Sequence, residues 1–338
     1  MHTQSWRRSP LHARDGSGTY SLRQAAFTPG TTIETAKVNS DFSDIAAGLT
    51  QSISKDGQTV YTASQPMGGF KLTGLGIGTG TGESARYDEL MLAARSMLSG
   101  LTLSRTSATV VGVAAGACAE SGNTAIISLS SSGSIDCATV GANGLDAGSL
   151  ANSTWYHAYA IMKADGTAAR LASTSVSSPT MPSGYTLKRR IGSFKTNGSA
   201  QIIDFVQDGD LYQWVTPTQD IVAANPGTGD VTRTLNVPTG VNVVANVQLV
   251  VTNTGTGGSS GAYLRDLATV TIVPGAGTGV GDTPSVAASA GNVAVSGSRV
   301  SVRTNTSAQI GSRLAFSDAS CQLIINTLGW TDRRGKDA

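Results

Sequence analysis

Apolar side chains recur every three or four positions in one stretch near the start of the chain. The positions are Val38, Phe42, Ile45, Leu49 and Ile53. This spacing predicts an amphipathic helix, because 3.6 residues complete one helical turn. The turn-forming run Lys55-Asp56-Gly57 is expected to end it. One narrow stripe cannot be buried by its own helix, so we expect it to pack on copies of itself, as in a trimer, or on neighbouring strands.

A glycine-rich stretch separates this helix from a second one. Glycine stands at every second position over 74–82, whereas a dinucleotide site needs G-x-G-x-x-G between a strand and a helix. We therefore expect no phosphate site here. A second helix is predicted to open at Ser84, with two acids near its positive end, and to end at Gly100. Its apolar positions are Leu90, Met91, Ala94, Met97 and Leu98.

From about residue 103 the apolar period shortens to two and the segments become short. Glycine- and serine-rich turns separate these segments, at the spacing typical of a β-sandwich or jelly-roll-like module. We predict a mainly β protein with a small α-helical N-terminal part. The predicted regions are an arm at 1–30, a small helical and extended domain at 31–102, a β-rich connector at 103–150 and a C-terminal β-domain at 151–338, which can divide again near 217–240.

The composition supports this prediction and limits the classes of partner that the protein is expected to bind. Glycine accounts for 41 of the 338 residues, and charged residues for only 14%, against a usual value of about 25%. Long helical bundles are disfavoured, and collagen would need a three-residue glycine period and abundant proline. The formal net charge is +2, with no basic run longer than those at 7–8, 188–190 and 333–334. Nucleic acid is therefore not an expected partner.

The sequence shows no membrane or metal signal. No stretch approaches the ~18 consecutive apolar residues of a membrane helix, so no membrane insertion is expected. The first eight residues lead into polar sequence, and we expect a protein that stays in the cytoplasm or leaves it without secretion. Cys118, Cys137 and Cys321 have no CxxC spacing, and we expect buried thiols. We expect no metal and no cofactor.

Few residues are candidates for catalysis. His157 is the one histidine inside a predicted strand, where we expect a structural, half-buried side chain. The run 257–261 matches G-x-S-x-G, but no histidine follows it, and we interpret it as a loop. Asp204, Asp208 and Asp210 lie beside aromatic residues and could act on a sugar as paired carboxylates. The run Asp208-Gly209-Asp210 is also an ordinary hairpin turn, which is the favoured interpretation, and no enzymatic activity is predicted.

The first 30 residues show neither a helical nor an alternating period. A polar arm without a core of its own is usually ordered by a partner, although it could also fold back on its own domain. Aromatic and cationic side chains form a strip that suits an acidic groove on a partner protein. These candidate anchoring residues are Trp6, Arg7, Arg8, His12 and Arg14.

Four short segments follow one another in the N-terminal part of the chain. They are FTPGTTI at 27–33, AKVN at 36–39 leading to DIA at 44–46, KDGQT at 55–59, and PMGGFKLTGL at 66–75. In this order they resemble the N-terminal region of tail-fibre and tail-spike-like proteins of tailed bacteriophages and prophages. The resemblance covers about residues 20–95. The stretch GLGIGTGTGES departs from the pattern, because the family is richer in alanine and proline there.

The resemblance implies an elongated homotrimeric fibre of the virion tail, assembled in the host cytoplasm. Its arm would dock on a tail, adaptor or portal protein, and its C-terminal β-domain would bind a host surface glycan or outer-membrane protein. The receptor-contact candidates are Trp155, Tyr185, Trp214 and Trp330. One alternative is a fibre adaptor or head-decorating fibre without receptor contact. The other is a surface-polysaccharide hydrolase, or tail spike, although the connector is short for a β-helix built from many stacked coils.

Overall fold

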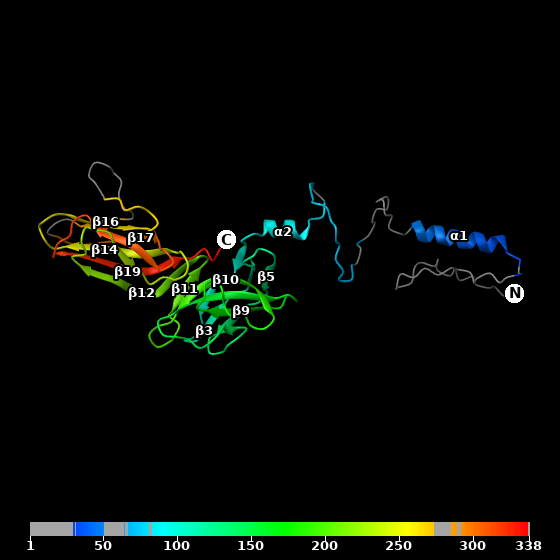
Figure 1. Cartoon of the computed structure of the whole chain (residues 1–338), viewed down its shortest axis with the longest axis horizontal. Helices are drawn as coiled ribbons and strands as arrows, with labels where there is room; N and C mark the ends of the chain where they lie inside the picture. Colours follow the sequence, from blue (N-terminus) through cyan, green and yellow to red (C-terminus); the bar gives the residue numbers. More distant parts are fainter. Residues whose placement is uncertain are drawn as a thin grey trace, which may run out of the picture. The chain divides into compact units, whose positions relative to one another are not determined.

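The computed structural model describes residues 30, 32–50, 64, 67–80, 83–273, 285–288 and 292–336. The chain divides between Gly74 and Leu75 into two compact units. Two helices and nineteen strands lie within the described residues, and both helices precede the first strand (Figure 1). The prediction of a mainly β protein with a small α-helical N-terminal part is confirmed.

The first unit contains helix α1 (Thr35–Thr50). Four of the five residues of the predicted apolar stripe lie on this helix, whereas Ile53 lies outside the described residues. Val38 and Ile45 are half-buried, and Phe42 is 65% exposed. The predicted helix is therefore present, and part of its apolar stripe faces solvent in the single chain.

Helix α2 (Tyr87–Ala93) lies near the start of the second unit. The backbone N–H of Arg86 donates to Glu89 Oε2 at 2.7 Å, which satisfies a group at the helix start. The longer helix predicted from the apolar spacing is wrong, because strand β1 (Leu98–Gly100) pairs with strand β4 (Gly116–Ala119). Pairing with a distant strand overrides the local helical period. The unit boundary thus falls inside the region predicted as 31–102.

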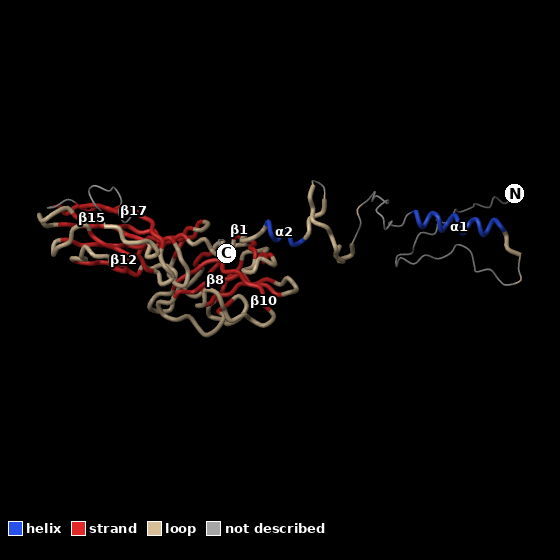
Figure 2. Tube along the Cα trace, turned by 45° about the horizontal axis from the view of Figure 1, so that its top comes forward, coloured by secondary structure: helices blue, strands red, loops and turns tan. Residues whose placement is uncertain are grey.

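The first β region, residues 98–195, consists of three small sheets. Besides β1 and β4, its strands are β2 (Leu103–Arg105), β3 (Val110–Val113), β5 (Ile126–Leu129), β6 (Gly133–Asp136), β7 (Gly144–Leu145), β8 (Trp155–Lys163), β9 (Ala168–Ser173) and β10 (Tyr185–Lys195). Their orders are β1-β4-β5, β2-β3-β6 and β10-β8-β9-β7. Figure 2 shows how densely strands fill the second unit. Strand β8 is buried along residues 155–161 and pairs with β9 and β10 on either side.

The remaining strands, after a short β11 (Phe205–Asp208), form a jelly roll. They are β12 (Leu211–Ala224), β13 (Val231–Thr234), β14 (Val244–Asn253), β15 (Ser260–Arg265), β16 (Ser285–Ala288), β17 (Asn292–Arg303), β18 (Gln309–Leu314) and β19 (Cys321–Thr331). One sheet has the order β11-β12-β19-β14-β17, and the other β13-β18-β15-β16. Among these eight strands the first pairs with the last, the second with the second-last, and so on inward. The pairs are β12 with β19, β13 with β18, β14 with β17, and β15 with β16. This is one long hairpin rolled into two sheets, and it begins at β12.

Strand β14 shows how the sequence pattern forms a half-buried sheet. Every second residue from Ala245 to Val251 is buried, whereas Asn246 and Gln248 between them are only half-buried. Successive side chains of a strand point to opposite faces, so the apolar set faces the partner sheet and the amides face outward. Val250 departs from this alternation, because it is also buried.

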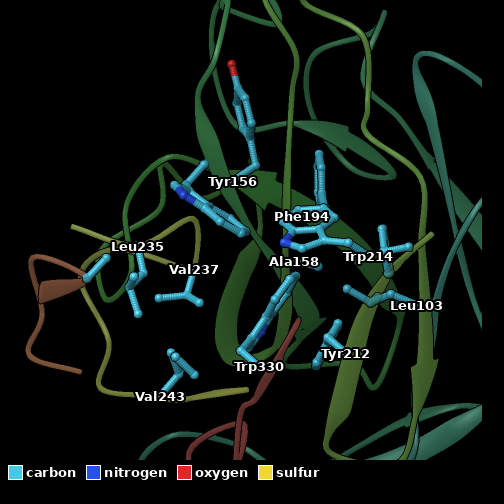
Figure 3. Packing of buried hydrophobic residues seen from close by; sticks show 14 of the residues in the cluster. Leu103, Tyr156, Ala158, Phe194, Tyr212, Trp214, Leu235, Val237, Val243 and Trp330 are labelled. Atoms are coloured by element: carbon cyan, nitrogen blue, oxygen red, sulfur yellow. The ribbon is translucent and has the colours of Figure 1, made fainter. Parts of the chain in front are cut away.

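A cluster of aromatic rings joins the first β region to the jelly roll (Figure 3). The ring centroid of Trp330 of β19 lies 5.3 Å from that of Trp155 of β8 and 4.9 Å from that of Trp214 of β12. Tyr212 stacks on Trp330 at 4.9 Å. Strand β19 can approach β12 this closely because residue 329 is a glycine. A Cβ at this position would overlap the carbonyl oxygen of Tyr212. One core therefore serves both β regions.

We expect Trp330→Ala to lower the free energy of unfolding by about 3–5 kcal/mol, because it empties the centre of this cluster. Urea unfolding, with all proteins at one concentration, measures the change. Val222→Ala on β12 is the control, since Val222 is 54% exposed. A loss of less than about 0.5 kcal/mol in the Trp330 variant contradicts the role given to the cluster.

Candidate functional site

The first unit has no apolar core within its described residues. Only Asp44 is buried among those whose burial is described, and it is polar. Large apolar side chains are exposed by 42% to 81%: Ile33, Phe42, Met67, Phe70 and Leu72. We call these five side chains the apolar surface of the first unit. Large apolar side chains that a unit does not bury in a core of its own are typical of a segment that is covered by another protein or another copy of the chain.

Helix α2 also exposes apolar side chains, within the second unit. Its Met91 is buried, but Tyr87 is 63% exposed and Leu92 is 69% exposed. The Tyr87 hydroxyl donates to the carbonyl oxygen of Thr124 at 3.0 Å, which fastens the helix to the first β region. A hollow of about 410 Å³ lies beside this contact. The outer side of α2 is thus a further candidate contact surface.

The predicted anchoring residues precede Gly30, the first residue that the structure describes. Trp6, Arg7, Arg8, His12 and Arg14 all lie outside the described residues. The anchoring role therefore stays a prediction.

Leu49 of the predicted trimer stripe lies on α1, within the described backbone.

The structure places the predicted receptor-contact tryptophans in the aromatic core. Trp155 is 9% exposed, Trp214 is 4% exposed and Trp330 is fully buried. The expectation of direct receptor contact is wrong for Trp155 and Trp330, because their rings are covered by each other and by neighbouring strands. Trp214 lines a hollow of about 490 Å³, but it is no more exposed than Trp155. Tyr185 is half-buried, and Lys163 Nζ lies 5.1 Å from the centroid of its ring.

His157 lies in a buried polar network and is fully covered by the fold. Its Nδ1 lies 2.9 Å from Ser193 Oγ, which also accepts a 2.9 Å hydrogen bond from Arg190. Burial lowers the pKa of His157 to about 4, and the neighbouring guanidinium of Arg190 acts in the same direction. The imidazole is therefore neutral at pH 7. The interpretation as a structural strand histidine is consistent with this geometry, but the expectation of a half-buried side chain is wrong, because His157 is 1% exposed.

The three carboxylates considered for sugar chemistry have other partners or settings, and Asp204 Oδ2 lies 3.8 Å from Arg105 Nη1. Asp208 and Asp210 flank the β11–β12 turn, as the hairpin interpretation predicts. Asp210 accepts hydrogen bonds from Lys336 at 2.9 Å and from Arg334 at 3.0 Å. Burial raises the pKa of Asp210, but these two cations outweigh it and hold the pKa below its usual range. A glycosidase acid needs a raised pKa, so Asp210 is unsuited to that role.

The remaining nucleophile candidates are structural. The G-x-S-x-G run begins in the loop after β14 and ends in the first two residues of β15, and no helix follows it in the described chain. All three cysteines are buried and free, as predicted. Burial raises the pKa of Cys118 and of Cys137 to about 12, so both thiols stay protonated near neutral pH and are poor nucleophiles.

A cleft of about 360 Å³ lies where the end of the chain returns to the first β region. Asp332 accepts two hydrogen bonds from Arg190, at 2.7 and 2.8 Å. The Arg334 guanidinium donates to Asp210, and these contacts fasten residues 332–336. We call this hollow the arginine cleft, because it is lined by Arg189, Arg190, Arg333 and Arg334. The sequence analysis noted these residues only as short basic runs and did not connect them.

Comparisons with models of protein families, with curated proteins and with solved structures find no match for this chain. Within the described ranges, no helix is long and apolar enough to cross a membrane. The same part of the chain holds no group of three or more side chains arranged to bind a metal ion. The function therefore has to be argued from the surfaces and the cleft.

We expect the protein to lose about 2 kcal/mol of stability between about pH 7.5 and pH 5 because of His157. The folded imidazole stays neutral down to a pKa of about 4, whereas the unfolded one takes up a proton near pH 6.5. Urea unfolding at several pH values measures the loss. In the His157→Asn variant this part of the pH dependence should disappear, and an unchanged slope would show that His157 is not the cause.

Proposed function

We propose that the protein is a non-enzymatic structural component of a bacteriophage virion, a homotrimeric tail fibre. Its N-terminal arm attaches to the tail, and its C-terminal β-domain binds the host surface. The observation that carries this proposal is the apolar surface of the first unit, which belongs to a unit without an apolar core in its described residues. The resemblance at residues 20–95 adds the class of assembly.

Self-association is the simplest way to bury this surface. Each buried square ångström of apolar area contributes about 25 cal/mol, so a set of large side chains from several copies can stabilise an assembly that one copy cannot. Phe42 lies at the centre of the α1 stripe and is 65% exposed. Three copies of α1 packed along this stripe would cover it, as in a coiled coil.

The second unit differs, because it is complete without a partner. Its buried side chains form a continuous core across both β regions. Jelly rolls occur in viral capsid and lectin domains, where their loops and outer faces bind other molecules. This likeness is one of fold class and supports host contact only as an analogy. A rigid β unit joined to an assembling segment is the arrangement that a receptor-binding fibre needs.

A fibre adaptor or head-decorating fibre remains the second candidate, since it would need the same self-association. Nothing in the described residues favours the hydrolase. Asp210 is held ionised by Arg334 and Lys336, and His157 is fully buried. Paired carboxylates of different pKa, which glycosidases use, are therefore not supported at this hairpin.

We expect the purified full chain to have three times the mass of one chain in light scattering. Phe42→Asp should shift it towards single chains, because each copy would bring a carboxylate into the helix contact. Ser43→Asp, an exposed neighbour on α1, is the matched control and should keep the trimer. A wild-type protein that is a stable monomer would remove the trimer from the proposal.

Deletion of residues 1–25 should abolish incorporation into particles without changing the mass of the assembled protein. The deleted segment carries the predicted anchoring strip but none of α1. Immunoblots of purified particles measure incorporation, and light scattering on the same variant provides the control. Particles that contain the shortened chain at the normal level would show that anchoring lies elsewhere.

A further inference from the structure

The arginine cleft holds a buried cation that no carboxylate pairs with directly. Arg189 is 2% exposed, and none of the ion pairs in the described part of the chain includes it. Its Nε is buried and has no hydrogen-bond partner, while its Nη2 donates to the carbonyl oxygen of Gly335. A buried charge without a counter-charge is costly and is a frequent mark of a binding site.

The nearby acids are already engaged. Asp332 is bound by both terminal nitrogens of Arg190. Glu120 attracts Arg189 electrostatically, but its carboxylate accepts hydrogen bonds at 2.8 Å from the backbone N–H groups of Gly122 and Thr124. Glu120 therefore offsets part of the charge of Arg189 without forming an ion pair with it. The lining of the cleft holds four arginines and one carboxylate, that of Asp332, so an excess of positive charge faces an incoming anion.

Neutral polar side chains surround this charge. Ser121, Asn242 and Thr306 line the cleft and are all exposed. They come from the β4–β5 turn, the loop before β14 and the β17–β18 turn. The Asn242 amide and the Thr306 hydroxyl can donate to and accept from the hydroxyl groups of a sugar. The Ser121 hydroxyl donates to the carbonyl oxygen of Lys188 at 2.9 Å and can still accept. The volume of about 360 Å³ lies in the range of about 300–1,000 Å³ for small-molecule sites.

We propose that the arginine cleft binds an acidic saccharide. The carboxylate or phosphate group of the sugar pairs with Arg189, and the sugar hydroxyls contact Ser121, Asn242 and Thr306. A guanidinium suits either anion, because its planar fork donates two parallel hydrogen bonds. This deepens the proposed host contact and rests on it for the source of the sugar, while the binding itself can be measured on the isolated chain.

The test is calorimetric titration of the full chain with glucuronate, glucose 6-phosphate, glucose and inorganic phosphate. We expect at least one acidic sugar to bind about tenfold or more tightly than glucose. The acidic sugar that binds more tightly shows whether the cleft prefers a carboxylate or a phosphate group. Glucose that binds as tightly as both acidic sugars, or binding of inorganic phosphate without any sugar, would overturn the proposal.

Variants locate the binding. Arg189→Gln should weaken the affinity for the acidic sugar by about tenfold or more, whereas Arg299→Gln should change this affinity by less than about twofold. Arg299 is an exposed arginine beside another hollow and serves as the matched control. Unchanged binding in Arg189→Gln would place the site elsewhere and overturn the assignment.

A second variant covers the case in which Arg189→Gln fails to fold. Asn242→Ala combined with Thr306→Ala removes two exposed side chains. This variant should bind the acidic sugar several-fold more weakly and should unfold at an unchanged temperature. Unaltered affinity in this variant contradicts the saccharide contacts. Trimer mass and particle incorporation are measured separately, so failure of the cleft and failure of the proposed fibre role give different results.

Discussion

The packing of Trp330 against Trp155 and Trp214 is the contact on which the second unit depends. Strand β19 lies in the middle of the larger jelly-roll sheet, between β12 and β14, so its position fixes both neighbours. Trp330 lies at the end of this strand and ties it to β8 of the first β region. The residues that follow then turn back and bind β10 through Asp332 and Arg190. The arginine cleft exists because this closure brings the last residues beside β10.

The two units differ in how far they bury their apolar side chains. The second unit buries most of its large aromatic and aliphatic groups in a main core that spans both β regions and in a smaller cluster around Tyr159. The first unit leaves Phe42, Phe70 and other large side chains at the surface. This contrast is the observation from which we propose an assembly, and it does not depend on the resemblance to phage fibres.

Local patterns predicted local structure well. The 3.6-residue period predicted α1, and the two-residue period predicted a β-rich chain from about residue 103, because both periods depend only on neighbouring residues. Contacts between distant residues were not predictable in the same way. Leu98 left the helical pattern to pair with Cys118, and the pairing of β12 with β19 joins segments about a hundred residues apart. For the same reason the tryptophans were taken as surface candidates, and the basic runs at 188–190 and 333–334 were not recognised as one cleft.

The central claim is that copies of this chain meet through their N-terminal parts in a tail fibre and carry the β unit to the host surface. An electron-microscopy reconstruction of intact particles, with the β unit marked by a bound antibody fragment, tests it most directly. The account predicts three marked β units on each fibre, attached to the tail. A single marked unit on each fibre, or marks on the head, would contradict it.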